Sequence, residues 1–239
     1  MRWFVSLAFA VVMTAPTFAQ EVPPGTVIPV MLLTTVDSAK AYDGQEITGA
    51  VMEAVPLPSG GYLPAKAKVL GHVVAARLGY PESPAVLALQ FDKIVFRGHE
   101  APINVNVRAI ASMVAVFDAQ VPTFVPDTTP RASLMFAPVG GEAAFRPDNP
   151  QESWREFVRF SGTPAPGCGD RVDKPGTTGA LWVFSPYACG AYGFGSNLTI
   201  AHDGAKNPMG QIVLTSRKRV SLQAGSGFLL RVQASPQME

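Results

Sequence analysis

Glycine and proline divide this sequence into short segments, and this feature most limits the folds open to it. The chain of 239 residues contains 22 glycines and 22 prolines. Both residue types interrupt helices, because glycine raises the entropic cost of ordering the backbone and proline lacks the amide donor. The segments between them are rich in branched and aromatic residues, which favours strands. The sequence therefore predicts an all-β protein, a small barrel or sandwich, with helix disfavoured almost throughout.

Five strands are predicted in the first half of the chain, each bounded by turn residues. They cover residues 26–33, 47–55, 68–77, 85–96 and 101–109. Five strands of this length within about 90 residues are typical of a small barrel or sandwich. We therefore expect one β domain over residues 22–116.

The last two of these runs form the clearest predicted hairpin, because Arg97-Gly98-His99-Glu100 provides a turn between them. In the second arm, apolar and polar residues alternate strictly. The apolar ones are Ile103, Val105, Val107 and Ala109, and the polar ones are Asn104, Asn106 and Arg108. This alternation indicates a strand with one buried and one solvated face.

Prolines interrupt every candidate element after residue 116, so residues 117–179 are predicted to form an irregular Pro/Gly-rich insertion. Within it, residues 151–160 are compatible with a short helix or with a strand. A loop of this length is unusual in a compact domain, which makes it either a stapled insertion or a flexible connection. Strands return at 180–185, 197–201, 211–216, 220–222 and 227–232. The segment 180–234 either completes the first barrel or forms a separate unit.

Residues 1–19 have the pattern of a secretory signal peptide. Arg2 supplies the positive charge, residues 4–13 are apolar, and Thr17-Phe18-Ala19 provides the residues read by a signal peptidase. The apolar run is well short of the roughly 20 residues that span a bilayer as a helix. We expect a mature chain that starts near Gln20, has no transmembrane helix, and is periplasmic, outer-membrane-associated or extracellular.

The charge of the chain argues against a nucleic-acid partner. Charged residues make up 15% of the sequence, and the formal net charge is +1 with Arg2 included. Loss of Arg2 with the signal peptide leaves a neutral chain, which has no broad electrostatic attraction for nucleic acid or anionic lipid. We expect no nucleic-acid partner.

The only two cysteines, Cys168 and Cys189, are predicted to form a disulfide. An even number of cysteines in an oxidising compartment usually pairs, and this pair would tie down the irregular insertion. Two reduced, buried thiols are the alternative. A metal site is less favoured, because neither cysteine has a histidine or a second cysteine at ligand spacing.

Residues with catalytic chemistry are present, but none forms a recognised motif. The histidines are His72, His99 and His202, and the carboxylates considered for hydrolysis are Asp92, Glu142, Asp170 and Asp173. No histidine stands beside a second ligand, and the glycine-rich turns around Ser196 and Ser226 do not match a nucleophile elbow. No phosphate-binding glycine loop occurs either. The sequence therefore predicts no catalytic, cofactor-binding or metal-ligating residue.

Aromatic residues gather around Cys189. Three of them are candidates for an exposed binding surface, namely Trp182, Tyr187 and Tyr192. Such a surface would bind a glycan or an envelope protein. The favoured alternative is a satellite core packed against the disulfide, because aromatic side chains bury large areas.

Turn residues near the N-terminus occur in a characteristic order. Pro24-Gly25-Thr26 precedes a strand, Asp43-Gly44-Gln45 forms a turn, and Leu63-Pro64-Ala65-Lys66-Ala67 leads to a strand that contains Gly71. This order resembles the β-barrel part of the VirB10/TrbI proteins of type IV secretion and conjugation, over about residues 22–75. The last turn lacks the glycine and serine of the family pattern. The resemblance implies a related barrel used in the cell envelope, and the remainder resembles uncharacterised secreted bacterial proteins.

Together these features favour a non-enzymatic envelope protein whose β domain scaffolds or binds partners. Two alternatives stay open. One is a secreted hydrolase that uses loop carboxylates, and the other is a component related to type IV secretion or conjugation. No cofactor is expected.

The predicted disulfide can be tested by thiol titration. Protein denatured without reductant is expected to show no reactive thiol, and reduction is expected to release two. A disulfide closing a loop of this length stabilises the fold by about 3 kcal/mol through the unfolded chain. Two reactive thiols before reduction would contradict the pairing of Cys168 with Cys189.

Overall fold

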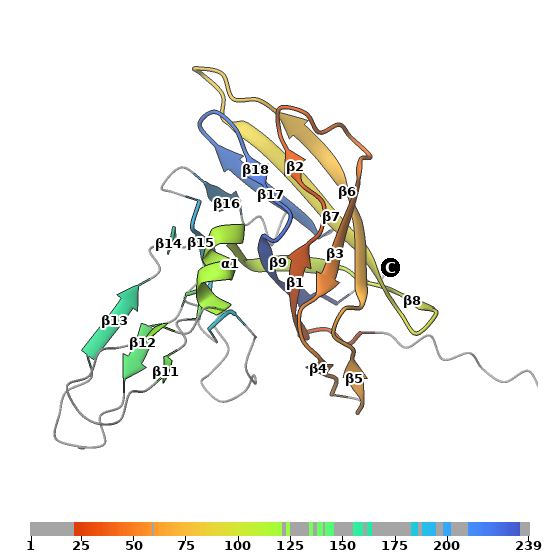
Figure 1. Cartoon of the computed structure of the whole chain (residues 1–239). Helices are drawn as coiled ribbons and strands as arrows, with labels where there is room; N and C mark the ends of the chain where they lie inside the picture. Colours follow the sequence, from red (N-terminus) through yellow and green to blue (C-terminus); the bar gives the residue numbers. More distant parts are fainter. Residues whose placement is uncertain are drawn as a thin grey trace, which may run out of the picture.

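The protein is mostly β, as predicted, and its main sheet, within the residues that the structure describes, is a mixed sheet of 11 strands (Figure 1). The computed structural model describes residues 22–58, 60–120, 123–124, 134–135, 138–140, 142–145, 155–159, 162–163, 183–185, 188–194, 198–201 and 210–234. In this part of the chain no helix is long and apolar enough to cross a membrane.

The elements follow one another closely in the first half of the chain. They are β1 (Val27–Leu32), β2 (Val36–Asp37), β3 (Glu46–Val51), β4 (Val55–Pro56), β5 (Tyr62–Leu63), β6 (Lys68–Arg77), β7 (Ala85–Phe96), β8 (His99–Pro102), β9 (Val105–Ala111) and α1 (Met113–Gln120). The later strands are shorter. They are β10 (Thr123–Phe124), β11 (Leu134–Met135), β12 (Glu142–Phe145), β13 (Arg155–Arg159), β14 (Gly162–Thr163), β15 (Gly190–Tyr192), β16 (Thr199–Ala201), β17 (Gln211–Ser216), β18 (Ser221–Leu222) and β19 (Gly227–Val232). In the described part of the chain, four two-stranded sheets pair β2 with β18, β4 with β5, β10 with β11 and β12 with β13.

The main sheet has the strand order β14-β15-β9-β19-β1-β3-β6-β7-β17-β16, with β8 also paired to β7. Its pairs are antiparallel except for β15 and β9, which run parallel. The C-terminal strand β19 lies between β9 and β1, and β17 pairs with β7. Strands from residues 180–234 therefore extend the sheet built by residues 27–111. The described strands form no closed barrel, because β14 and β16 end the order without pairing to each other.

The concave face of the sheet encloses the main core. The rings of Phe91 on β7 and Phe228 on β19 meet edge to face, with centroids 5.6 Å apart. Three strands separate β7 from β19 in the sheet order, so this contact requires the sheet to curve back on itself. Such curvature follows from the twist of strands and from bulges. Two bulges lie between β6 and β7, at Leu70/Gly71 and Val73/Ala75.

The predicted hairpin is confirmed for its first arm and its turn, and is wrong for most of its second arm. Arg97 and Gly98 adopt positive φ angles of 50° and 79° between β7 and β8. The ladder with β7 ends at Pro102, and the Ile103 amide donates one more hydrogen bond to the Asp92 carbonyl of β7 at 2.9 Å. The chain then crosses to β19, where β9 forms its own ladder. The local sequence of β9 does not indicate that β19 is its partner.

The predicted alternation of the second arm is confirmed as far as Val107, since Asn104 and Asn106 are half-buried between buried apolar residues, but it is wrong at Arg108. Arg108 is only 4% exposed, and β9 is buried on both sides from Val107 onward. A bulge opposite Leu229 and Leu230 interrupts the alternation, so that Val107 packs into the main core whereas Ala109 packs into a second cluster. This cluster includes Ala109 and Ala111 of β9, the buried side of α1, and Val183, Phe184, Ala188 and Tyr192.

Helix α1 was not predicted from the sequence, and the expected domain boundary at residue 116 falls inside it. Ser112 caps its first turn, because the Ser112 Oγ accepts a hydrogen bond from the Ala115 amide at 3.1 Å. The helix buries Ala115, Val116 and Ala119. These side chains are small, so the apolar periodicity of the segment is weak.

Two further predictions concern segments that the structure describes only in part. Residues 155–159 form β13, so the strand alternative for 151–160 is confirmed there. The strand predicted at 180–185 is wrong for 183–185, where Phe184 makes only an isolated bridge to Val139. Residues 180–182 lie outside the described part.

The aromatic contact across the core generates a stability prediction. Phe228→Ala is expected to lower the free energy of unfolding by about 3–5 kcal/mol, because it leaves a cavity where β7 and β19 face each other across the curved sheet. Chemical denaturation monitored by circular dichroism measures this loss. Phe117→Ala is the matched control, since Phe117 is 64% exposed and its replacement is expected to cost about 0.5 kcal/mol or less. Equal losses in the two variants would contradict the proposed role of the core contact.

Candidate binding cleft

The aromatic residues predicted to form a binding surface are only partly described. Trp182 and Tyr187 lie outside the described residues, whereas Tyr192 on β15 is 9% exposed. The Tyr192 hydroxyl accepts a hydrogen bond from the Cys189 amide at 3.0 Å and donates one to the Cys189 carbonyl at 3.1 Å. Burial raises the pKa of Tyr192. Tyr192 is therefore part of the second cluster and does not contribute to an exposed surface.

The predicted disulfide is not shown by the described residues. Cys189 is 6% exposed and is not a free thiol. Cys168 lies outside the described part of the chain, so the tie between the insertion and Cys189 stays a prediction. The satellite core beside Cys189 does include Phe184 and Tyr192.

The structure brings together two residues that the sequence presented separately. His72 on β6 and Asp92 on β7 form a pair across the two strands, with 2.8 Å between Nδ1 and Oδ2. Their side chains are 37% and 41% exposed. A histidine oriented by a carboxylate also needs a nucleophile for covalent hydrolysis. Within the described residues, His72 has no hydrogen bond to a serine, threonine or cysteine side chain.

The other candidate catalytic residues are not assembled into a site by the described residues. His99 lies on β8 and is exposed. For Glu142 only the backbone is described, in β12, and His202, Asp170 and Asp173 lie outside the described part. Among described residues no group of three His, Cys, Asp or Glu side chains is placed to hold a metal ion.

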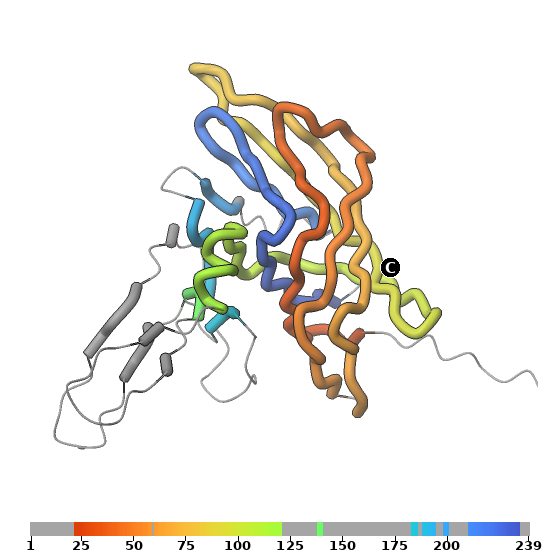
Figure 2. Tube along the Cα trace, in the orientation of Figure 1, coloured from red at the N-terminus to blue at the C-terminus, as the bar shows by residue number. Residues whose placement is uncertain are grey.

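A cleft of about 660 Å³ lies instead at one end of the sheet, between the β6–β7 turn and the β17–β18 turn. We call it the tip cleft, and it is lined by Gly79, Tyr80, Pro81, Glu82, Ser83, Pro84, Arg217 and Lys218. Figure 2 shows these two turns side by side, the first in yellow-orange and the second in blue. Sequence reasoning missed this site, because its two halves are more than 130 residues apart in the chain.

Backbone contacts join the two turns. The Gly79 amide donates to the Lys218 carbonyl at 3.0 Å. A Cβ atom at position 79 would lie 2.2 Å from the Arg217 carbonyl oxygen, so only glycine permits this approach. The amides of Tyr80 and Ser83 donate to each other's carbonyl oxygens at 2.8 and 3.1 Å, which closes the first turn around Pro81 and Glu82.

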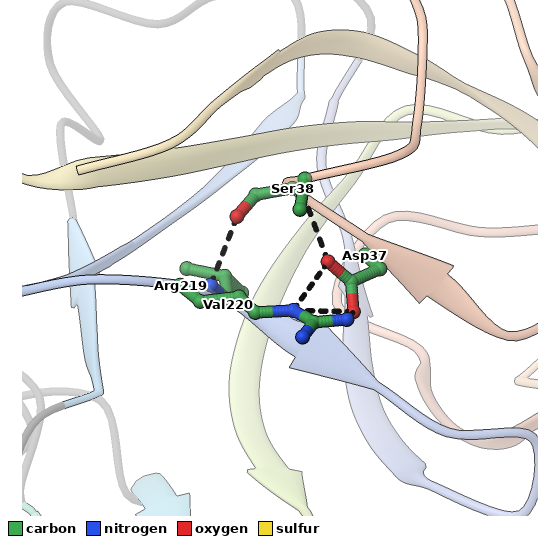
Figure 3. A network of polar contacts seen from close by, with 5 residues as sticks. Asp37, Ser38, Arg219 and Val220 are labelled. Atoms are coloured by element: carbon green, nitrogen blue, oxygen red, sulfur yellow. Dashed lines mark hydrogen bonds and ion pairs between the residues drawn. The ribbon is translucent and has the colours of Figure 1, made fainter.

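An ion pair anchors the second turn to β2 (Figure 3). The Arg219 Nε donates to both carboxylate oxygens of Asp37, at 2.7 and 2.8 Å, and its Nη2 also donates to Oδ2. The Ser38 amide donates to the Val220 carbonyl at 2.8 Å, and the Val220 amide donates to the Ser38 Oγ at 3.0 Å. We call this set of contacts the clasp. It holds the chain immediately after Lys218.

The clasp uses one cation of the second turn and leaves the other two available to ligands. Arg219 is paired with Asp37, whereas the side chains of Arg217 and Lys218 have no ion pair or hydrogen bond within the described part of the chain. Tyr80 is 70% exposed on the opposite wall. The cleft therefore presents two cations, one carboxylate at Glu82 and an aromatic ring to solvent.

A second cleft, of about 340 Å³, is lined by residues that include Pro24, Arg108, Arg231 and Ala234. Its Arg108 is 4% exposed and its Nε donates to the Ala188 carbonyl at 3.1 Å. This arginine serves the packing of the second cluster. The tip cleft, with its exposed and unpaired charges, is the better candidate for binding.

The clasp predicts a pH dependence of stability. The hydrogen bond from Arg219 lowers the pKa of Asp37 below its ordinary value near 4, although burial opposes the shift. The folded state then binds this proton less readily than the unfolded state. The contribution of the pair is present above the unfolded pKa and is lost as the pH falls through the lower, folded pKa.

Asp37→Asn is accordingly expected to lower the denaturation midpoint at neutral pH, and the difference from the parent protein is expected to shrink below about pH 4. Urea denaturation at a series of pH values measures it. Asp43→Asn, which removes an exposed carboxylate outside the clasp, is the control and should leave the midpoint nearly unchanged. If the difference in denaturation midpoint between Asp37→Asn and the parent protein stays constant down to about pH 2, the stability does not depend on protonation of Asp37.

No protein-family model matches this sequence, and no curated protein matches it. No residue role is therefore transferred from a relative. The case for the tip cleft rests on its geometry and charge.

Proposed function

We propose that this chain is an exported, non-enzymatic envelope protein whose β domain binds a partner at the tip cleft. The observation that carries the proposal is the pair of cations, Arg217 and Lys218, which have no partner within the described part of the chain and line the same cleft as the exposed Tyr80. Charged and aromatic groups that have no internal partner are available to a ligand. Export rests on the signal peptide pattern of residues 1–19.

The construction of the cleft supports a binding role. Its walls are tight turns that are bonded to each other and anchored by the clasp, so little chain ordering is needed when a ligand binds. The cleft volume of about 660 Å³ lies within the usual range for small-ligand sites. The sheet behind it provides a rigid scaffold.

The resemblance of residues 22–75 to the VirB10/TrbI barrel supports a place in the envelope, since it concerns turns that surround a curved sheet. A component of a secretion or conjugation system is therefore an alternative that keeps the same envelope location.

The hydrolase alternative would use Asp92 or the acids of the central segment. A hydrolase would release soluble fragments from an envelope polymer, whereas a binding protein would not.

Retention on isolated cell envelopes tests the proposal. The mature protein is expected to sediment with envelopes of the native host, and a Tyr80→Ser, Lys218→Gln double variant is expected to lose at least about fivefold in retention, or about 1 kcal/mol. The matched control is a Tyr62→Ser, Lys68→Gln variant, because Tyr62 is 62% exposed and Lys68 is also exposed, away from the cleft.

Three outcomes would count against the proposal. Equal retention of the two double variants would remove the cleft from the binding surface. Release of soluble fragments that is lost in Asp92→Asn would show an enzyme. Recovery of Met1 at the amino terminus of the protein from the native host would exclude export through a cleaved signal.

A further inference from the structure

The tip cleft has the size and the chemistry for a ligand with one negative charge and several hydroxyl groups. Its volume of about 660 Å³ accommodates one or two sugar rings. This inference rests on the proposed binding function and adds the class of ligand.

Arg217 and Lys218 favour an anion. Neither side chain is engaged within the described part of the chain, and both line the same wall. An arginine guanidinium donates two parallel hydrogen bonds to a carboxylate, and a lysine ammonium adds a third donor group. A ligand carboxylate would give Arg217 and Lys218 the kind of partner that the Asp37 carboxylate gives to Arg219.

Glu82 selects against a doubly charged anion. Its carboxylate lines the same cleft and has no ion pair within the described residues. Like charges in one small site repel, so a dianionic phosphate is disfavoured relative to a carboxylate with a single charge. An ionised glutamate only accepts hydrogen bonds, and sugar hydroxyl groups are suitable donors.

Tyr80 provides a surface for a ring. Its side chain is 70% exposed, and the backbone at Tyr80 is held by the hydrogen bonds that close the turn, so the ring is presented to solvent from an ordered segment. An aromatic ring has an apolar face and, in tyrosine, a polar edge. This combination suits the apolar C–H face of a pyranose whose hydroxyl groups point outward.

We propose that the tip cleft binds a saccharide that carries a carboxylate, with a sugar ring on Tyr80, the carboxylate on Arg217 and Lys218, and a hydroxyl group on Glu82. Carboxylated sugars are part of bacterial envelope polymers, which agrees with the envelope location proposed above. The overall near-neutral charge of the chain is compatible with this site, because recognition depends on a local pair of cations.

Calorimetric titration with two disaccharides tests the inference. The acidic probe is N-acetylglucosaminyl-N-acetylmuramic acid, and the neutral probe is di-N-acetylchitobiose. The parent protein is expected to bind the acidic probe at least about tenfold more tightly, a difference of about 1.4 kcal/mol. Arg217→Gln with Lys218→Gln should remove this preference, whereas Tyr80→Ser should weaken binding of both probes.

Inorganic phosphate is the third probe and separates a general anion site from a saccharide site. Phosphate that competes with the acidic disaccharide at equal concentration would overturn the selection against a dianion. Equal affinity for the two disaccharides would overturn the role of the cations. The Tyr62→Ser, Lys68→Gln variant should bind both disaccharides like the parent, and circular dichroism should confirm that all variants are folded.

The outcome is separable from that of the envelope experiment. If envelope retention depends on Tyr80 and Lys218 but neither disaccharide binds, the saccharide inference is wrong and the binding function stands. If neither retention nor titration responds to these substitutions, the cleft has no binding role. Because Arg217, Lys218 and Tyr80 are exposed, their replacement is not expected to unfold the protein.

Discussion

Burial of the concave face of one curved sheet is the interaction on which the structure depends. The contact of Phe91 with Phe228 joins strands that are separated by three others in the sheet, and the fully buried side chains of β1, β6 and β7 fill the same interior. The curvature needs the bulges between β6 and β7 and the close approach at Gly71, where a Cβ atom would lie 2.1 Å from the Gln90 carbonyl oxygen. Without this curvature the apolar face would meet solvent.

The same sheet places the tip cleft. Because β17 pairs with β7 along Ala85–Gln90, the turn that follows β17 is carried to the turn that precedes β7. Gly79 then allows the two backbones to meet, and the clasp between Asp37 and Arg219 fixes the far side of the second turn to β2. The cleft is thus a consequence of strand pairing, and its charges are those that the clasp leaves unpaired.

Much of the fold could be predicted from local pattern. β1, β6, β7, β17 and β19 each lie within a segment predicted as a strand, because period-two apolar runs between glycine and proline turns are a strong local signal. α1 was missed because its buried side chains are alanines and one valine, and the Ser112 cap is a short signal. The second arm of the hairpin was misassigned at Pro102, beyond which the chain finds β19 as a partner.

The sequence by itself determined the strand content, the turns and the apolar interior, since these follow from side-chain size, branching and backbone freedom within a few residues. Tertiary structure alone decided the partner of β9, the burial of Arg108, the meeting of His72 with Asp92 and the formation of the tip cleft. Each of these joins residues that are distant in the chain. Strand order sets such contacts, and strand order depends on the packing of the whole core, which no local pattern records.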